Sequence, residues 1–245
     1  MKNSIQLSIV LLLFASTITN AQSWGNWEKI KGNGNQKNER RTTAEYDEIK
    51  LQGYYDVDLI AGKEGEITVQ AEENLMPYIK IEVEGNVLKI YQEKGKNLQP
   101  SKGNKILITV PFDKISAVSL SGSGDVNTKN LIKTDKFTAT LSGSGDLNLD
   151  IEANDVEAKL SGSGDVRLKG KSDKLTVSIS GSGDITASNL IVNDVEAGIS
   201  GSGDIKVNCS GNLNARVSGS GDIFYSGEPK NKDTKVSGSG NIKKG

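Results

Sequence analysis

The sequence predicts an all-β protein whose larger part is a parallel β-solenoid of seven repeats, each about 19 residues long. The first observation is a Gly-Ser-Gly-Asp motif, flanked by apolar residues, that recurs seven times, with Asn in place of Asp in the last copy. The second is the alternation of apolar and polar residues around each copy, a period of two that indicates strands. The third is the near-identity of the copies, which favours stacking in register because each coil then places like residues over like. Successive antiparallel hairpins would fit the spacing but would not require this identity.

Each repeat contains a block of 13 residues that reads apolar-x-apolar-x-apolar-Ser-Gly-Ser-Gly-Asp-apolar-x-apolar, as in residues 156–168. A straight strand of that length would extend about 43 Å, beyond the usual length of strands. The block is therefore expected to bend at its two glycines, because glycine tolerates a positive φ and the close approach of another backbone. The segments between blocks, such as 129–136 and 226–231, vary in length and are expected to be polar surface loops. The predicted corner glycines are Gly122, Gly124, Gly143, Gly145, Gly162, Gly164, Gly181, Gly183, Gly201, Gly203, Gly219, Gly221, Gly238 and Gly240.

The composition excludes several functional classes. The 245 residues carry a formal net charge of −1, so no basic surface for nucleic acid is expected. Histidine is absent, which removes the commonest general base and the usual zinc ligand. The Gly-x-Gly pattern is not a nucleotide-binding loop, because no Lys-Ser/Thr pair and no helix follow it. The single cysteine, Cys209, cannot form a disulfide within the chain and is expected to be a solvated or half-buried thiol.

Four segments follow one another along the chain. Residues 1–21 are predicted to be a secretory signal peptide, in which Lys2 precedes a short apolar run and Ala21 suits cleavage, so the protein is expected to be exported to the periplasm, the outer surface or the medium. Residues 22–43 are polar and are interpreted as a flexible leader. Residues 44–115 alternate like strands but lack the motif, and are expected to form an irregular β region that caps the solenoid of residues 116–245. No segment after the signal is long and apolar enough to cross a membrane.

Three stretches carry a resemblance to a known family. They are the run Gly53-Tyr54-Tyr55-Asp56-Val57-Asp58-Leu59, the run Ala71-Glu72-Glu73-Asn74-Leu75, and the serial Ser-Gly-Ser-Gly-Asp blocks. Together they resemble the putative auto-transporter adhesin, head GIN domain family of exported bacterial proteins, over roughly residues 46–243. The resemblance implies a β-helix-like fold and an adhesin-like role, and brings no catalytic residues. Ser116, Lys232 and Asn241 depart from the repeat pattern, but they lie in terminal blocks, where atypical repeats are expected.

A row of aspartates is the most specific candidate for a functional site in this sequence. In register, neighbouring carboxylates would lie about 4.8 Å apart and repel by about 0.9 kcal/mol even in water. Three interpretations remain open: each carboxylate accepts hydrogen bonds from the backbone of its own corner, as in an Asx-turn; the row binds calcium; or it forms a catalytic set. The first is favoured, because a catalytic set is usually unique and calcium rolls repeat more densely. The row consists of Asp125, Asp146, Asp165, Asp184, Asp204 and Asp222.

The paired serines of each block, such as Ser161 and Ser163, are expected to form a flat polar surface beside this row. They could simply satisfy one another through hydroxyl ladders, or they could present a platform for a glycan or a protein partner. We therefore expect an exported, non-enzymatic, adhesin-like solenoid without a cofactor. The alternatives are a carbohydrate-active β-helical enzyme and a purely structural envelope protein. A small closed homo-oligomer is expected, because poorly charged faces that repeat in register can pack side by side.

Overall fold

The structure is a computed structural model that describes residues 27–245. The predicted signal peptide and the first residues of the predicted leader lie outside this range. The described chain consists mainly of strands, with one short 3-10 helix, η1 (Met76–Tyr78). The strands are β1 (Glu28–Lys31), β2 (Gln36–Thr42), β3 (Glu48–Gly53), β4 (Asp56–Ala61), β5 (Glu66–Glu72), β6 (Ile79–Glu84), β7 (Val87–Gln92), β8 (Lys96–Gln99), β9 (Leu107–Phe112), β10 (Ala117–Gly122), β11 (Val126–Thr128), β12 (Ile132–Gly143), β13 (Leu147–Gly162), β14 (Val166–Ile179), β15 (Ile185–Ile199), β16 (Ile205–Asn208), β17 (Asn212–Gly219), β18 (Ile223–Ser226), β19 (Asn231–Gly238) and β20 (Ile242–Lys244).

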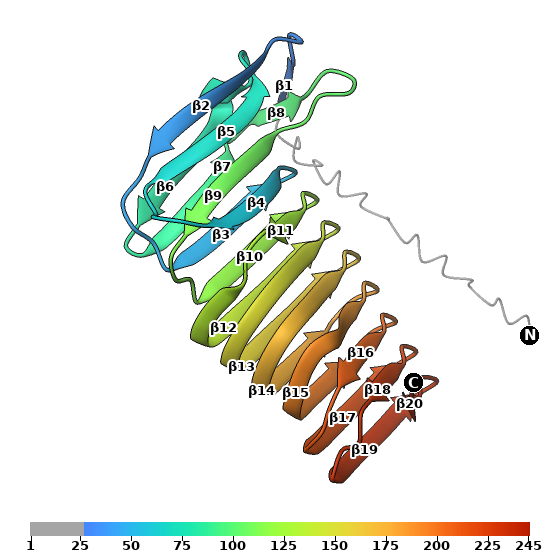
Figure 1. Cartoon of the computed structure of the whole chain (residues 1–245). Helices are drawn as coiled ribbons and strands as arrows, with labels where there is room; N and C mark the ends of the chain where they lie inside the picture. The colour runs from blue at the N-terminus through green and yellow to red at the C-terminus, as the bar shows by residue number, and fades with distance from the viewer. Residues whose placement is uncertain (1–26) are drawn as a thin grey trace, which may run out of the picture.

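From β10 to β20 the coils stack in parallel, which confirms the predicted solenoid (Figure 1). One side of the stack contains β3, β10, β12, β17 and β19 and the second halves of β13, β14 and β15. The other side contains β4, β11, β16, β18 and β20 and the first halves of the same three strands. We call the outer surface of the first side the serine face and that of the second side the aspartate face, after the residue type that recurs on each.

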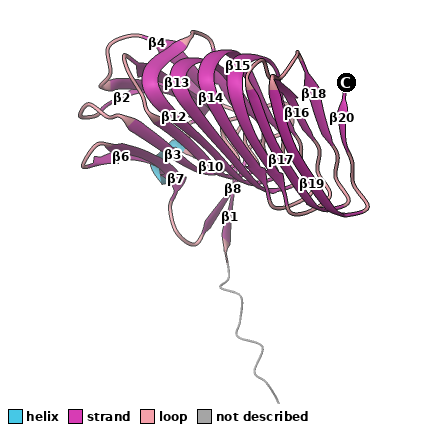
Figure 2. Cartoon of the chain, turned by 90° about the horizontal axis from the view of Figure 1, so that it is seen from below, coloured by secondary structure: helices cyan, strands magenta, loops and turns pink. Residues whose placement is uncertain are grey.

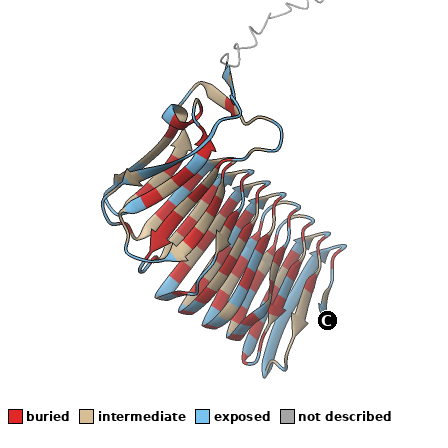
Figure 3. Cartoon of the chain, turned by 45° about the horizontal axis from the view of Figure 1, so that its top comes forward, coloured by how far each residue is buried: buried red, intermediate tan, exposed pale blue. Residues whose placement is uncertain are grey.

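The strand register equals the sequence repeat. Between β12 and β13 each residue lies opposite the one 19 positions later, for example Leu141 opposite Leu160. Like residues therefore form columns along the solenoid axis, about 4.8 Å apart. The inward columns are apolar, and Val156, Ala158 and Leu160 of β13 are each at most 2% exposed. Figure 3 shows these buried positions as bands that recur from coil to coil.

The connectors between repeats differ from the loops that the sequence predicts. Three of them, 129–131, 209–211 and 227–230, do leave the strands, but in the middle coils β13, β14 and β15 continue through the connector. The reason is that the alternation persists there: Ile151 and Ala153 point inward and are buried. A length difference is then absorbed within the strands, as in the irregular register near Arg167 between β14 and β15. Each middle coil has one sharp corner, at the glycines, and one curved end made of strand.

The solenoid begins one coil earlier than the motif indicates. β3 pairs in parallel with β10 so that Gly53 lies opposite Gly122, and β4 pairs with β11 so that Val57 lies opposite Val126. The corner of this coil has Tyr54 and Tyr55 where later coils have Ser and Gly. The predicted boundary at residue 116 is therefore too late, because the first coil keeps the geometry without the motif.

The cap is built outward from this first coil. β7 and β9 add a further parallel turn to β3 and β4, and then the direction reverses: β6 pairs antiparallel with β7, and β5 antiparallel with β9. Figure 2 shows β2 and β6 at one end of the stack and β19 and β20 at the other. The reversal ends the parallel stacking, which agrees with the predicted capping role of the irregular region.

Most of the predicted leader is ordered, which corrects its interpretation as a flexible segment. β1 pairs with β8, and β2 forms an antiparallel edge strand on β5. The polar, charged sequence of β2 suits an edge strand, where charged side chains discourage pairing with a further strand. The guanidinium of Arg41, in β2, donates a hydrogen bond to the carbonyl oxygen of Met76 at 2.9 Å. A second group of hydrogen bonds to the carboxylate of Glu72 also holds the segment in place.

Glu72 is only 1% exposed and holds this segment to the cap. Its carboxylate accepts hydrogen bonds from the backbone N–H of Gly34 and from the backbone N–H and hydroxyl of Ser101, the latter two at 2.8 and 2.6 Å. Burial by itself raises the pKa of Glu72, but these hydrogen bonds outweigh it and hold that pKa below its usual value. A side chain at Gly32 would displace this carboxylate, since a Cβ there would lie 2.0 Å from Oε2 of Glu72.

Cys209 is fully buried, which corrects the expectation of a solvated or half-buried thiol. It lies in the curved end of its coil, with Sγ 3.3 Å from the carbonyl oxygen of Asn193. Ser172 lies in the curved end of an earlier coil, where its hydroxyl donates to the carbonyl oxygen of Lys174 at 2.7 Å. Burial raises the pKa of the Cys209 thiol, so it remains protonated at neutral pH.

Candidate binding surface

Two columns of outward-facing residues dominate the serine face. The first is the serine that precedes each corner, exposed in every coil: Ser121, Ser142, Ser161, Ser180, Ser200, Ser218 and Ser237. The second lies two positions earlier on the same strands: Ser119, Thr140, Lys159, Ser178, Gly198, Arg216 and Lys235. The hydroxyls of the first column form no hydroxyl ladder, and within residues 27–245 none has a hydrogen-bond partner. They are free to donate to and accept from a ligand.

A groove of about 790 Å³ runs along these columns from β12 to β19. Within the groove, the smallest side chains of the second column are those of Ser178 and Gly198, which lie opposite each other on β14 and β15. Gly198 is not required by the backbone: its φ is not positive, and a Cβ built on it would meet nothing within 4 Å. A glycine inside a strand usually weakens the strand. Its presence here leaves the floor of the groove open.

The charged residues that line this groove are all cations: Lys159, Arg216 and Lys235. Two of them pair with carboxylates just outside it, Lys159 with Glu157 at 2.7 Å and Arg216 with Asp233 at 2.5 Å. Both cationic side chains are about half exposed, at 52% and 42%. Exposed pairs of this kind contribute little to stability and can exchange partners. The groove can therefore offer its cations to an anionic ligand.

A second groove, of about 460 Å³, continues the first toward the cap. Both are lined by Thr140 and Ser142, and the second is also lined by Glu82, Glu84 and Tyr91 of the cap. The hydroxyl of Tyr91 donates to the carboxylate of Glu82, which raises the pKa of Tyr91, and Lys89 pairs with Glu84. Both carboxylates thus already have partners within the cap.

The corner glycines lie where two backbones approach each other. A Cβ on any of the fourteen would fall 1.8–2.2 Å from a carbonyl oxygen of the coil before, as at Gly164, whose neighbour is Gly145. Five of them, the first glycine of a corner in each case, also have a positive φ, for example +149° at Gly162. The close approach therefore runs along the axis, from coil to coil.

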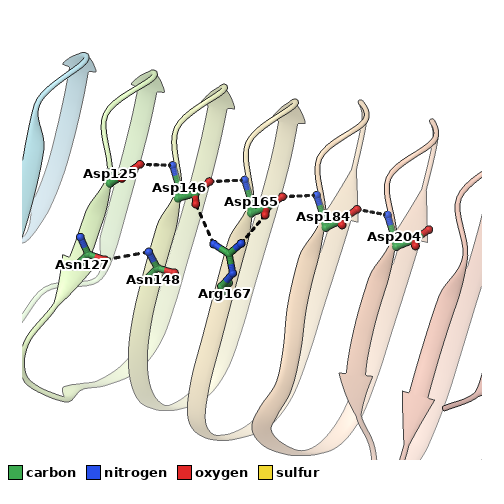
Figure 4. Close-up of polar contacts among 8 residues, drawn as sticks. All are labelled: Asp125, Asn127, Asp146, Asn148, Asp165, Arg167, Asp184 and Asp204. Atoms are coloured by element: carbon green, nitrogen blue, oxygen red, sulfur yellow. Dashed lines mark hydrogen bonds and ion pairs between the residues drawn. The ribbon is translucent and has the colours of Figure 1, made fainter.

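The aspartates form a ladder that joins consecutive coils (Figure 4). The backbone N–H of Asp165 donates to Oδ1 of Asp146 at 3.1 Å, and the N–H of Asp184 donates to Oδ1 of Asp165 at 3.2 Å. The same contact joins Asp125 to Asp146, Asp184 to Asp204, Asp204 to Asp222 and Asp222 to Asn241. Backbone amides are the donors, as favoured, but they come from the next coil and not from the carboxylate's own corner. At the last step Asn241, through its side chain and backbone, holds the pKa of Asp222 below its usual value.

The sequence and the fold of this chain both match those of known proteins. Residues 45–229 match the family described as putative auto-transporter adhesin, head GIN domain, which is most of the chain. The chain belongs to this family. The expected resemblance is thereby confirmed, and no match is found among curated proteins.

Three solved structures have a similar architecture. A putative adhesin from Bacteroides fragilis is 26% identical, with a TM-score of 0.81 and coverage of 88% of this chain and 99% of that one. A putative lipid binding protein from Parabacteroides distasonis is 28% identical, with a TM-score of 0.75 and coverage of 89% and 100%. A putative adhesin from the same organism is 25% identical, with a TM-score of 0.66 and coverage of 89% and 100%. The family and two of these neighbours carry the name of adhesins, and none of the three that of an enzyme.

In this head GIN domain, sequence reasoning missed the counterion of the aspartate ladder. Arg167 reaches Oδ2 of Asp146 at 2.9 Å and Oδ2 of Asp165 at 2.6 Å, and so bridges two coils. It stands two positions after its aspartate, in a column that also contains the Asn127–Asn148 amide pair (Figure 4). The signal was available, because residues two positions apart on a strand share a face. By pairing with both aspartates, Arg167 relieves part of the repulsion between neighbouring carboxylates that the sequence predicts.

Neither a metal site nor a membrane helix is found in the described chain. No three His, Cys, Asp or Glu side chains of residues 27–245 are grouped closely enough to hold a metal ion. Over the same range no helix has the length and apolar character needed to cross a bilayer. Calcium binding by the aspartate row remains a hypothesis for experiment.

Proposed function

We propose that this head GIN domain is an exported, non-enzymatic binding protein that attaches to a surface partner through its serine face. The observation that supports the proposal most strongly is the long run of exposed serine hydroxyls without a partner, set along a continuous pair of grooves. A surface held flat by in-register coils presents the same groups at each step, which suits a partner that is itself extended or repetitive. The adhesin names of the family and of two structural neighbours agree with this role.

The aspartate face suits this role less well. Its carboxylates are engaged in the ladder and with Arg167, so fewer of its polar groups are free. An enzymatic role finds little support in the grooves, because Glu82 and Glu84 are both engaged by neighbours and the larger groove contains no carboxylate. The name of the lipid binding neighbour raises the question of an acyl ligand. The apolar residues lining the larger groove are almost fully covered, with Leu160 2% and Ile199 3% exposed, so an acyl chain would contact mainly the carbon atoms of the small and cationic side chains there.

The test is binding of the purified protein to an array of glycans and surface proteins, with one variant on each face. Ser180→Gln places a larger neutral side chain in the serine column, and Thr186→Gln is the matched control on the aspartate face. We expect Ser180→Gln to weaken binding by at least about tenfold, equivalent to 1.4 kcal/mol, and Thr186→Gln to leave it unchanged. Equal effects of the two variants, or no ligand on the array, would contradict the proposal.

A further inference from the structure

We infer that the larger groove of the serine face binds an acidic polysaccharide, laid along the solenoid axis. This inference rests on the proposed function and names the class of partner. Three observations lead to it: the sign of the charges, the chemistry of the free groups, and the direction of the groove.

The charge is the first step. The whole chain is nearly neutral, with 30 basic and 31 acidic residues, yet the groove from β12 to β19 contains three cations and no carboxylate. Lys235 makes no ion pair within residues 27–245, and the partners of Lys159 and Arg216 lie outside the groove. A negatively charged ligand would therefore meet only cations among the charged lining residues of the groove, while Glu157 and Asp233 beyond the lining are held in ion pairs. Arg216 can also bind a carboxylate or sulfate through two parallel N–H groups.

The free groups are the second step. A hydroxyl both donates and accepts, so a column of unpartnered serines matches the hydroxyls of a sugar chain. The strands under the groove have their backbone groups paired with neighbouring coils. This pairing disfavours a peptide that binds by adding a strand, because such a peptide needs a free sheet edge.

The direction is the third step. The groove crosses successive coils, so a bound polymer meets an equivalent serine about every 4.8 Å. That interval is close to the length of one pyranose ring, and a linear polysaccharide can therefore repeat its contacts from coil to coil. The space over Gly198, between Lys159 and Arg216, is where the ring substituents can approach the backbone most closely. We expect it to hold the acidic group.

The experiment measures binding of size-matched fragments to the purified protein by calorimetry. Polygalacturonate is compared with its fully methyl-esterified form, which has the same backbone without charge, and dextran sulfate with dextran. We expect each acidic polymer to bind at least about tenfold more tightly than its neutral counterpart, and the difference to shrink at about 1 M salt. The stronger of the two acidic polymers identifies the acidic group as carboxylate or sulfate.

Variants locate the site. Arg216→Gln with Lys235→Gln should remove most of the preference for the acidic polymer, and Gly198→Gln should weaken binding by filling the floor. Lys206→Gln, on the aspartate face, removes one positive charge elsewhere and should have no effect. Thermal melting of each variant shows that the fold is retained. Loss of binding in Lys206→Gln equal to that in the groove variants would overturn the assignment.

The outcomes separate this inference from the proposed function. Equal binding of polygalacturonate and its methyl ester would refute the acidic preference. Binding of poly-glutamate as tight as that of polygalacturonate, and equally sensitive to the groove variants, would refute a polysaccharide ligand. If the array finds a partner that Ser180→Gln abolishes while no acidic polysaccharide binds, the inference fails and the proposed function stands.

Discussion

Adding one methyl group at a corner glycine should destabilise the whole stack. In Gly164→Ala the new Cβ would lie 1.9 Å from the carbonyl oxygen of Gly145. Ordinary contact begins at 3.4 Å, so the coils would have to separate locally by about 1.5 Å, a third of their spacing. Such a shift strains the packing at a cost of about 1–3 kcal/mol. It also weakens the corner hydrogen bonds that Gly143 accepts from the N–H groups of Ser163 and Gly164, at 2.9 and 3.2 Å.

Together these effects should lower the free energy of unfolding by about 3–5 kcal/mol. For a chain of this size that is a fall in melting temperature of about 6–20 °C. The φ of Gly164 is not positive, so the effect is steric and does not come from backbone conformation. Urea unfolding followed by circular dichroism gives the midpoint and its slope for each variant.

Gly198→Ala is the matched control, because it adds the same methyl group to a glycine with nothing within 4 Å. It should be neutral or stabilising by about 0.4–1 kcal/mol, since alanine restricts the unfolded chain. A shift in Gly164→Ala no larger than that in Gly198→Ala would refute the coil-to-coil contact as the reason for the corner glycines.

Four further predictions follow from the ladder, the cap and the faces. Arg167→Gln should cost at most about 1 kcal/mol, and the loss should vanish at about 1 M salt; a loss that persists in salt would mean that Arg167 acts through packing. Because the pKa of Glu72 is depressed in the folded protein, its stabilising effect is present above the unfolded pKa of about 4.3 and is lost as the pH falls through the folded pKa. Glu72→Gln should therefore melt lower than the parent protein at neutral pH and approach it in acid, and a constant difference from neutral pH to acid would contradict this. Removing calcium with EDTA should leave the melting temperature unchanged, whereas a rise of several degrees on adding calcium would show that the aspartate row binds it. Light scattering should find a dimer or trimer if the predicted closed oligomer forms, and a mass that grows with concentration would exclude it.

The repeat could be predicted from sequence because in-register stacking copies each residue type into a column. Leu160 and Gly164 stand where the alternation places them. The first coil was missed because Tyr54 and Tyr55 replace the motif. That replacement is possible because no equivalent corner stacks on its outer side, so Tyr55 can carry a Cβ where later coils cannot.

The binding surface was only partly predictable. The serine columns follow from the motif, but the groove depends on which outward residues become neighbours across coils. Ser178 and Gly198 meet only because β14 and β15 pair with a shift of 20 positions in place of 19. Arg167 and Asp146 are 21 positions apart and meet diagonally, because Arg167 stands two positions after Asp165, the neighbour of Asp146 at the ordinary shift of 19. Contacts between coils depend on the strand register, and the register cannot be predicted from the residue pattern of a single repeat.

The position of the first coil gives folding a direction. Within the array, partners such as Leu141 and Leu160 are 19 positions apart, but Leu51 of β3 must find Leu120 of β10, 69 positions later, around the whole of the cap. Closing the longer loop costs about 1 kcal/mol more in chain entropy, and non-local pairing is slow. Nucleation is therefore expected among the local coils of the array, and docking of the cap at this junction should be the slower step. Mutations in β3 or β10 would delay that docking, whereas mutations in β17 or β19 would leave the earlier coils to form.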